Sequence, residues 1–202
     1  MSMILGLGTL TEANIARVLA DPPLIWQLIA PDDPEMYTLA RSEGAGRPGL
    51  LGRLFGRGAA APEPAPLDLG PTEGVHGDLD KAWHGLHYLF TQTAFEGSPP
   101  LNFLLAGGRE IGTVDVGYGP ARVFSAAETG TIHAALSAQS DEALAGRFAP
   151  SAMMKADIYP AIWNRPPEQD DTLGYLMENL ETLRAIVAKA AADGTGLVIF
   201  LS

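Results

Sequence analysis

The 202-residue sequence contains no cysteine, few basic residues and no long apolar run. The absence of cysteine excludes disulfides, thiolate metal sites and a cysteine nucleophile. Lys and Arg number 13 against 24 Asp and Glu, and this net charge of −11 argues against a nucleic-acid partner, because phosphate binding needs a basic face. No apolar run approaches the roughly 18 residues of a membrane-spanning helix, so we expect no transmembrane segment.

The composition is that of a folded chain, with 47% hydrophobic and 18% charged residues. On folding, a chain of this length buries about 70% of the surface that it exposes when unfolded. Its core therefore does not need disulfides for stability. We therefore predict a single domain over residues 1–202. The N-terminal stretch lacks the basic region of a signal peptide, and we expect a cytoplasmic location.

Residues 41–75 differ from their surroundings and predict a flexible insertion in this domain. The second half, AAAPEPAPLDLGPTEG, is rich in Pro and Ala and is typical of an extended loop. The first half is basic, and its apolar side chains are Leu50, Leu51, Leu54 and Phe55. If these four side chains share one face of a helix, we expect that face to make a weak contact with a membrane surface or a partner. Gly52 and Gly56 would each destabilise a helix there by about 1 kcal/mol. A loop with an apolar turn is therefore the simpler interpretation.

The clearest predicted elements lie near the two ends of the sequence. Residues 3–8 form an apolar run that predicts a buried first strand. From Thr172 to about Ala192, apolar residues recur at helical spacing, and Gly194 ends this helix. The following LVIFLS predicts a buried terminal strand. We therefore expect a helix-rich α+β domain in which both ends contribute to a small mixed or antiparallel sheet.

Two pairs of residues predict where helices begin. Thr9 with Glu12, and Ser125 with Glu128, fit the Ser/Thr-x-x-Glu capping box. In such a box each of the two side chains accepts a hydrogen bond from the other residue's backbone N–H group. The sequence therefore predicts one helix after Thr9 and another after Ser125.

Gly6 and Gly8 follow the first apolar run, which is where a dinucleotide-binding loop would lie. The third glycine of that fingerprint is replaced by Thr11, and no alternating β-α-β series follows. We interpret the two glycines as a structural turn.

Three blocks of sequence occur in a recognisable order: DLDKAWHGLHYLFTQ, then GYGPARVFS, then IYPAIW. With the MSMILG start, the long amphipathic helix and the hydrophobic end strand, they resemble the YfbM-like family, a bacterial domain of unknown function. The resemblance covers most of the chain outside residues 41–75. It implies a compact α+β fold and a small soluble bacterial protein, and it brings no catalytic assignment. The polar and aromatic residues at the matched positions are Asp80, Trp83, His87, Tyr118, Arg122, Tyr159 and Trp163.

His84 joins this set as a candidate, because it lies three residues from His87 and helix neighbours have that spacing. A metal would need further ligands, and the H-x-x-H spacing lacks the glutamate of helical metal motifs. A hydrogen-bonded core histidine is the simpler interpretation of His87. We predict neither a metal nor a cofactor. Asp80, or the nearby Asp78, is also an expected cap of the helix that carries this pair.

The aromatic residues predict a pocket if they converge. Tyr118, Tyr159 and His87 would together frame a site with aromatic walls and few polar groups. Tyr118 and Arg122 lie in or beside the turn GYGPAR and would suit a carboxylate or phosphate. The glycines of that turn fit a tight bend equally well, and Trp83 fits the apolar stripe of its helix.

No motif specifies a reaction. The sequence favours a non-catalytic binding or interaction module that recognises a protein partner or a small ligand, with an acidic surface suited to a basic partner. The alternative is a hydrolase or transferase in which His87 acts as general base beside a carboxylate and a tyrosine. An enzyme requires an open pocket at His87, whereas a binding protein leaves His87 in a filled environment.

Overall fold

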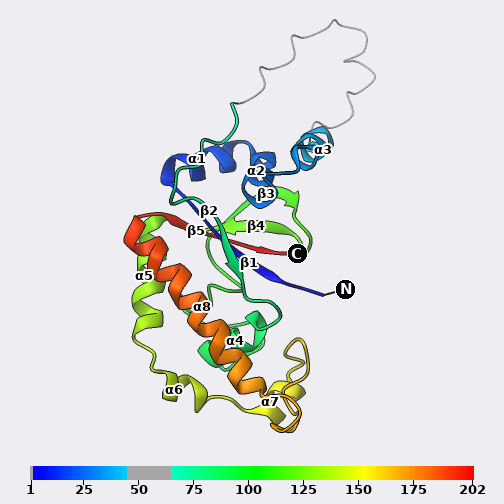
Figure 1. Ribbon diagram of the computed structural model, residues 1–202, viewed down its shortest axis with the longest axis vertical. Coiled ribbons are helices and arrows are strands. Elements are labelled where there is room, and N and C mark those ends of the chain that lie inside the picture. The colour runs from blue at the N-terminus through cyan, green and yellow to red at the C-terminus, as the bar shows by residue number, and fades with distance from the viewer. Residues whose placement is uncertain (1, 45–64) are drawn as a thin grey trace, which may run out of the picture.

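The first and last strands of the chain pair at the centre of one antiparallel sheet (Figure 1). The computed structural model describes residues 2–44 and 65–202. The strands in this part are β1 (Leu5–Leu10), β2 (Gly74–Asp78), β3 (Arg109–Asp115), β4 (Pro120–Val123) and β5 (Gly196–Leu201). The helices are α1 (Glu12–Ala20), the 3₁₀ helix η1 (Pro22–Ile25), α2 (Trp26–Ile29), α3 (Pro34–Gly44), α4 (Trp83–Thr91), α5 (Ala126–Ser137), α6 (Asp141–Ala145), α7 (Pro150–Lys155) and α8 (Thr172–Asp193).

The strand order is β2-β1-β5-β4-β3, and every pair in it is antiparallel. In the central pair, Leu5 lies opposite Leu201 and Leu10 lies opposite Gly196. This confirms the predicted α+β class and the prediction that both chain ends build the sheet.

Helices cover both faces of the sheet, as the alternation of side chains along β5 shows. Leu197 and Ile199 belong to the core that β1 shares with α4, α5 and α8. Val198 and Phe200 point the other way, into a second core with α1, η1 and α2. Successive residues of a strand face opposite sides, so a strand buried on both sides reads as a continuous apolar run. In Figure 1 the two groups of helices lie on opposite sides of the strands.

Two of the predicted helix boundaries are confirmed, and the predicted cap of α1 is wrong. Ser125 and Glu128 form the expected capping box of α5, and α8 ends at Gly194 in the left-handed conformation. Thr9, however, does not cap α1, because β1 continues through Leu10 and holds Thr9 within the sheet. The cap is Thr11, whose side chain accepts a hydrogen bond from the backbone N–H of Asn14.

The interpretation of Gly6 and Gly8 as a turn is also wrong, since both lie inside β1. A Cβ atom at Gly6 would lie 2.2 Å from the ring of Phe200 on the neighbouring strand. Glycine is therefore needed there for close packing between strands and not for a bend.

Asp78 and Asp80 do not cap α4. This helix begins at Trp83, with Ala82 in the cap position and no side-chain capping bond. Instead, the Asp78 carboxylate accepts a hydrogen bond from the backbone N–H of Asp80 at 2.8 Å, and Asp80 has a φ of 43°. The two aspartates form the turn that precedes the helix.

The segment predicted as an insertion is bounded by regular structure. Helix α3 extends over its first residues to Gly44, and β2 begins at Gly74. The predicted apolar contact residues Leu50, Leu51, Leu54 and Phe55 lie outside the described residues. In the described part of the chain, no helix is long and apolar enough to cross a membrane.

Candidate functional site

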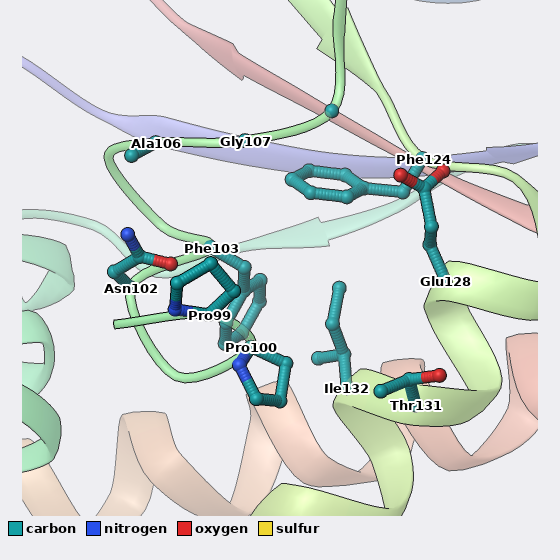
Figure 2. A pocket seen from close by; sticks show the side chains of 11 residues that line it. Pro99, Pro100, Asn102, Phe103, Ala106, Gly107, Phe124, Glu128, Thr131 and Ile132 are labelled. Carbon is teal, nitrogen blue, oxygen red and sulfur yellow. The ribbon is translucent and has the colours of Figure 1, made fainter. Parts of the chain in front are cut away.

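An open pocket of about 250 Å³ lies between α5 and the loop that leads into β3, and we call it the α5 pocket (Figure 2). Its walls are mainly apolar, with the rings of Phe103 and Phe124 and the side chain of Ile132 facing it. The remaining lining residues are Pro99, Pro100, Asn102, Ala106, Gly107, Gly108, Glu128 and Thr131. An apolar concavity with a few polar groups is the usual form of a small-ligand site.

The helix side of this pocket is fixed by the capping box. The Glu128 carboxylate accepts hydrogen bonds from the Ser125 backbone N–H at 2.8 Å and from the Ser125 hydroxyl at 2.7 Å. These bonds, together with the nearby Arg109, hold the pKa of Glu128 below its usual value despite a small opposing effect of burial. Glu128 therefore brings a negative charge to the rim of the pocket at neutral pH.

The loop side of the pocket is held by Arg122 on β4. Its guanidinium donates hydrogen bonds to the backbone carbonyls of Phe103, Leu104 and Gly107 at 2.6–3.2 Å, and it lies 5.7 Å from the centre of the Phe124 ring. Burial lowers the pKa of Arg122, and the Glu110 carboxylate partly opposes this shift. Both terminal nitrogens of the predicted anion-binding arginine are thus engaged by the loop.

Trp83, Tyr118 and Arg122, three of the predicted site residues, do line one pocket together. It has a volume of about 170 Å³ and lies beside the ends of β1 and β5. Neither His87 nor Tyr159 belongs to its lining. Tyr118 is 42% exposed there, whereas the Tyr159 ring stacks on Trp83 with a centroid distance of 5.7 Å.

His84 is fixed in its neutral form by two backbone groups. Its Nδ1 accepts a hydrogen bond from the backbone N–H of Tyr159 at 3.0 Å, so the proton resides on Nε2. That Nε2–H donates to the carbonyl of Ala94 at 2.8 Å. The ring also stacks on Trp83 at 5.0 Å, and burial lowers its pKa. His84 therefore acts as a structural link between α4, the following loop and the segment around Tyr159.

His87 is fully buried on α4. Among the described residues, neither of its ring nitrogens has a hydrogen-bond partner. Burial, and to a lesser extent the neighbouring His84, lower the pKa of His87 to about 4, and the backbone of Glu96 has a smaller opposite effect. The imidazole is therefore neutral at physiological pH and has no contact with solvent in this conformation.

The other two candidates are Asp80 and Trp163, and each is held by hydrogen bonds in a different part of the structure. The Asp80 carboxylate accepts a hydrogen bond from the Tyr175 hydroxyl on α8 at 2.9 Å, and burial followed by this interaction raises the pKa of Tyr175. Trp163 is 1% exposed, and its indole N–H donates to the carbonyl of Ile158 at 2.7 Å. In residues 2–44 and 65–202, no group of three or more His, Asp or Glu side chains is arranged to hold a metal ion.

The α5 pocket was not among the sites predicted from the sequence. Its lining comes from the loop before β3, the end of β4 and one side of α5. The one local signal was the capping box, which identified Glu128 as a helix-start residue and said nothing of a ligand. Phe103, Phe124 and Ile132 have no spacing that distinguishes a pocket wall from a core.

A five-stranded antiparallel sheet with helices on both faces defines an α+β domain, and this fold resembles that of one solved structure over nearly its whole length. That structure is the crystal structure of a protein of unknown function, YfbM from Escherichia coli, which aligns with a TM-score of 0.62 and 15% sequence identity. The alignment covers 98% of this chain and 99% of that chain.

A family model described as Domain of unknown function (DUF1877) matches residues 1–200. The chain therefore belongs to this family, which confirms the predicted YfbM-like resemblance. A search of curated protein sequences finds no match.

Proposed function

We propose that this domain is a non-catalytic binding module that takes a small, mostly apolar ligand in the α5 pocket. The observation that carries the proposal is that this pocket is open to a ligand, whereas the candidate catalytic and anion-binding side chains are not. The pocket is open and has apolar walls, whereas His84 and Arg122 donate to backbone carbonyls and His87 is sealed in the core. A general base must reach a proton of its substrate, directly or through one water. The position of His87 therefore supports binding over a hydrolase or transferase role.

The size of the pocket limits the ligand. Its volume of about 250 Å³ lies just below the range of about 300–1,000 Å³ that is typical of sites for drug-sized molecules. An apolar body of one aromatic ring fits this space. Fragments of that size gain at most about 1.5 kcal/mol per atom and usually much less, so we expect millimolar affinity for a simple probe.

The test is a titration of ¹⁵N-labelled protein with 2-phenylethanol, followed by amide chemical shifts. We expect saturable shifts at the amides of Phe103–Gly108 and of the first turns of α5. The variant Thr131→Trp places an indole at the mouth of the pocket from an exposed position, so we expect it to weaken binding at least fivefold with little effect on folding.

Val75→Trp is the matched control, because it adds the same ring at a 43% exposed position on β2, away from the pocket lining. We expect this control to bind the probe like the unaltered protein. Equal affinity in both tryptophan variants, or shifts scattered over the whole surface, would contradict the proposal.

A further inference from the structure

Two polar side chains of the α5 pocket, Asn102 and Thr131, form hydrogen bonds to neighbouring backbone carbonyls. The amide nitrogen of Asn102 donates to the carbonyl of Gly97 at 2.9 Å, and the Thr131 hydroxyl donates to the carbonyl of Ala127 at 3.0 Å. In Figure 2 the amide oxygen of Asn102 lies on the pocket side of its side chain. One N–H of the Asn102 amide is thus engaged, and its oxygen atom is presented to a ligand, whereas the Thr131 hydroxyl is turned back to its own helix.

Glu128 brings a charged acceptor to the pocket. Both hydrogen bonds from Ser125 reach its Oε2 atom, and no hydrogen bond to Oε1 occurs within the described residues. Arg109 lies near enough to act on Glu128 electrostatically, but no ion pair within 4.0 Å joins them in the described part of the chain. One oxygen of an ionised carboxylate thus remains available at the rim, above walls of Phe103, Phe124 and Ile132.

From this arrangement we infer that the α5 pocket selects an organic amine with an apolar body, such as an arylalkylammonium ion. The apolar body would lie against the two phenylalanine rings, and the ammonium group would donate to the free carboxylate oxygen of Glu128. A charged ammonium group has donors and no acceptor, which matches this oxygen. The net charge of −11 favours the approach of a cation to the protein as a whole. This inference rests on the proposed binding function and specifies its ligand class.

The experiment compares three probes that share a phenyl ring on a short chain: phenethylamine, 2-phenylethanol and 3-phenylpropionate. We expect the amine to bind about three- to fivefold more tightly than the alcohol, and the carboxylate to bind more weakly than both. The preference is modest because Glu128 is exposed to solvent, where an ion pair contributes at most about fivefold. It should shrink as the salt concentration rises from 20 to 500 mM, since salt screens exposed charges.

The variant Glu128→Gln removes the negative charge of this side chain and keeps its role in the capping box of α5. Glutamine also completes a capping box at this helix position, so we expect α5 to stay folded while the amine loses its preference over the alcohol. Glu181→Gln on the exposed side of α8 is the control that removes one negative charge elsewhere, and we expect the preference to persist.

The outcomes distinguish the inference from the function on which it rests. If none of the three probes shifts the pocket amides, both the binding function and the ligand class are wrong. If the alcohol binds and the amine binds no better, or if the carboxylate binds best, the pocket is a ligand site and the amine inference is wrong. An amine preference that survives Glu128→Gln would also overturn the inference, because Glu128 would then not be the recognising group.

Discussion

Replacing Trp163 with alanine is expected to lower the free energy of unfolding by about 4 kcal/mol, a large part of the 5–15 kcal/mol that stabilises a typical domain. The indole is almost completely buried, and it packs so closely on α4 that a Cβ atom at Gly85 would lie 2.6 Å from the ring. The substitution leaves a cavity beside Gly85 and removes the hydrogen bond to the Ile158 carbonyl. Urea denaturation followed by circular dichroism measures the loss.

Two controls identify the source of that loss. Trp163→Phe keeps a ring in place and removes the indole N–H, so we expect a loss of about 1–2 kcal/mol. Tyr118→Ala removes another aromatic residue of the predicted site, but this residue is 42% exposed, and we expect a change within about 0.5 kcal/mol. If Trp163→Ala cost less than about 1 kcal/mol, the ring would not be the core element that its burial indicates.

The second large effect concerns acid pH. His87 titrates near 6.5 in the unfolded chain, whereas burial lowers its pKa to about 4 in the folded domain. Because the folded pKa is the lower one, the stability present above pH 6.5 is lost as the pH falls toward 4. We expect the free energy of unfolding to fall by about 2 kcal/mol between pH 7 and pH 5, and by about 3 kcal/mol in total. Urea midpoints measured at half-unit pH steps test this.

The variant His87→Leu removes the titrating group. We expect its stability curve to be flatter between pH 7 and pH 5, and its stability at pH 7 to be no lower than that of the unaltered protein, because two unpartnered buried nitrogens disappear. His133→Gln on α5 changes a histidine that is partly exposed, and the slope should remain. If His87→Leu retained the slope, other groups would be responsible for it.

The pH window separates this effect from that of the carboxylates. Burial raises the pKa of Glu73, but several hydrogen bonds together outweigh it, and hydrogen bonds also hold Glu128 low, so that the pKa of both carboxyl groups lies below the usual value of about 4.5. Their contributions to stability are therefore lost at lower pH than most of the His87 contribution. Comparing His87→Leu with the unaltered protein above pH 5 isolates the histidine.

Features that depend on local pattern were predictable from the sequence. The long helix α8, its end at Gly194 and the buried strand β5 follow from apolar spacing and a terminal glycine. The capping box of Ser125 and Glu128 follows from two residues three positions apart. Each of these signals lies within one element and does not depend on the rest of the fold.

Features that depend on packing were not predictable. Trp163 and Tyr118 are both aromatic residues of matched blocks, yet one is sealed in the core and the other is exposed. Arg122 looked like an anion-binding residue because the carbonyls that engage it lie 15 to 19 residues earlier in the chain. Helix α3 extends into the first residues of the segment 41–75, and strand β2 begins before its end, although the composition of the segment predicts a loop. Composition describes a segment and does not reveal which neighbours satisfy its hydrogen bonds.

The pairing of β1 with β5 has a consequence for how the domain is made. Leu5 and Leu201 lie opposite each other, so the ladder at the centre of the sheet joins residues separated by nearly the whole sequence. Closing so long a loop costs entropy before any contact is formed, and folds dominated by distant contacts fold slowly. On the ribosome, β1 and β4 remain without their shared neighbour until β5 has left the exit tunnel. The sheet is therefore completed only after β5 has been synthesised, and until then the apolar side chains of β1 lack the strand that pairs with them.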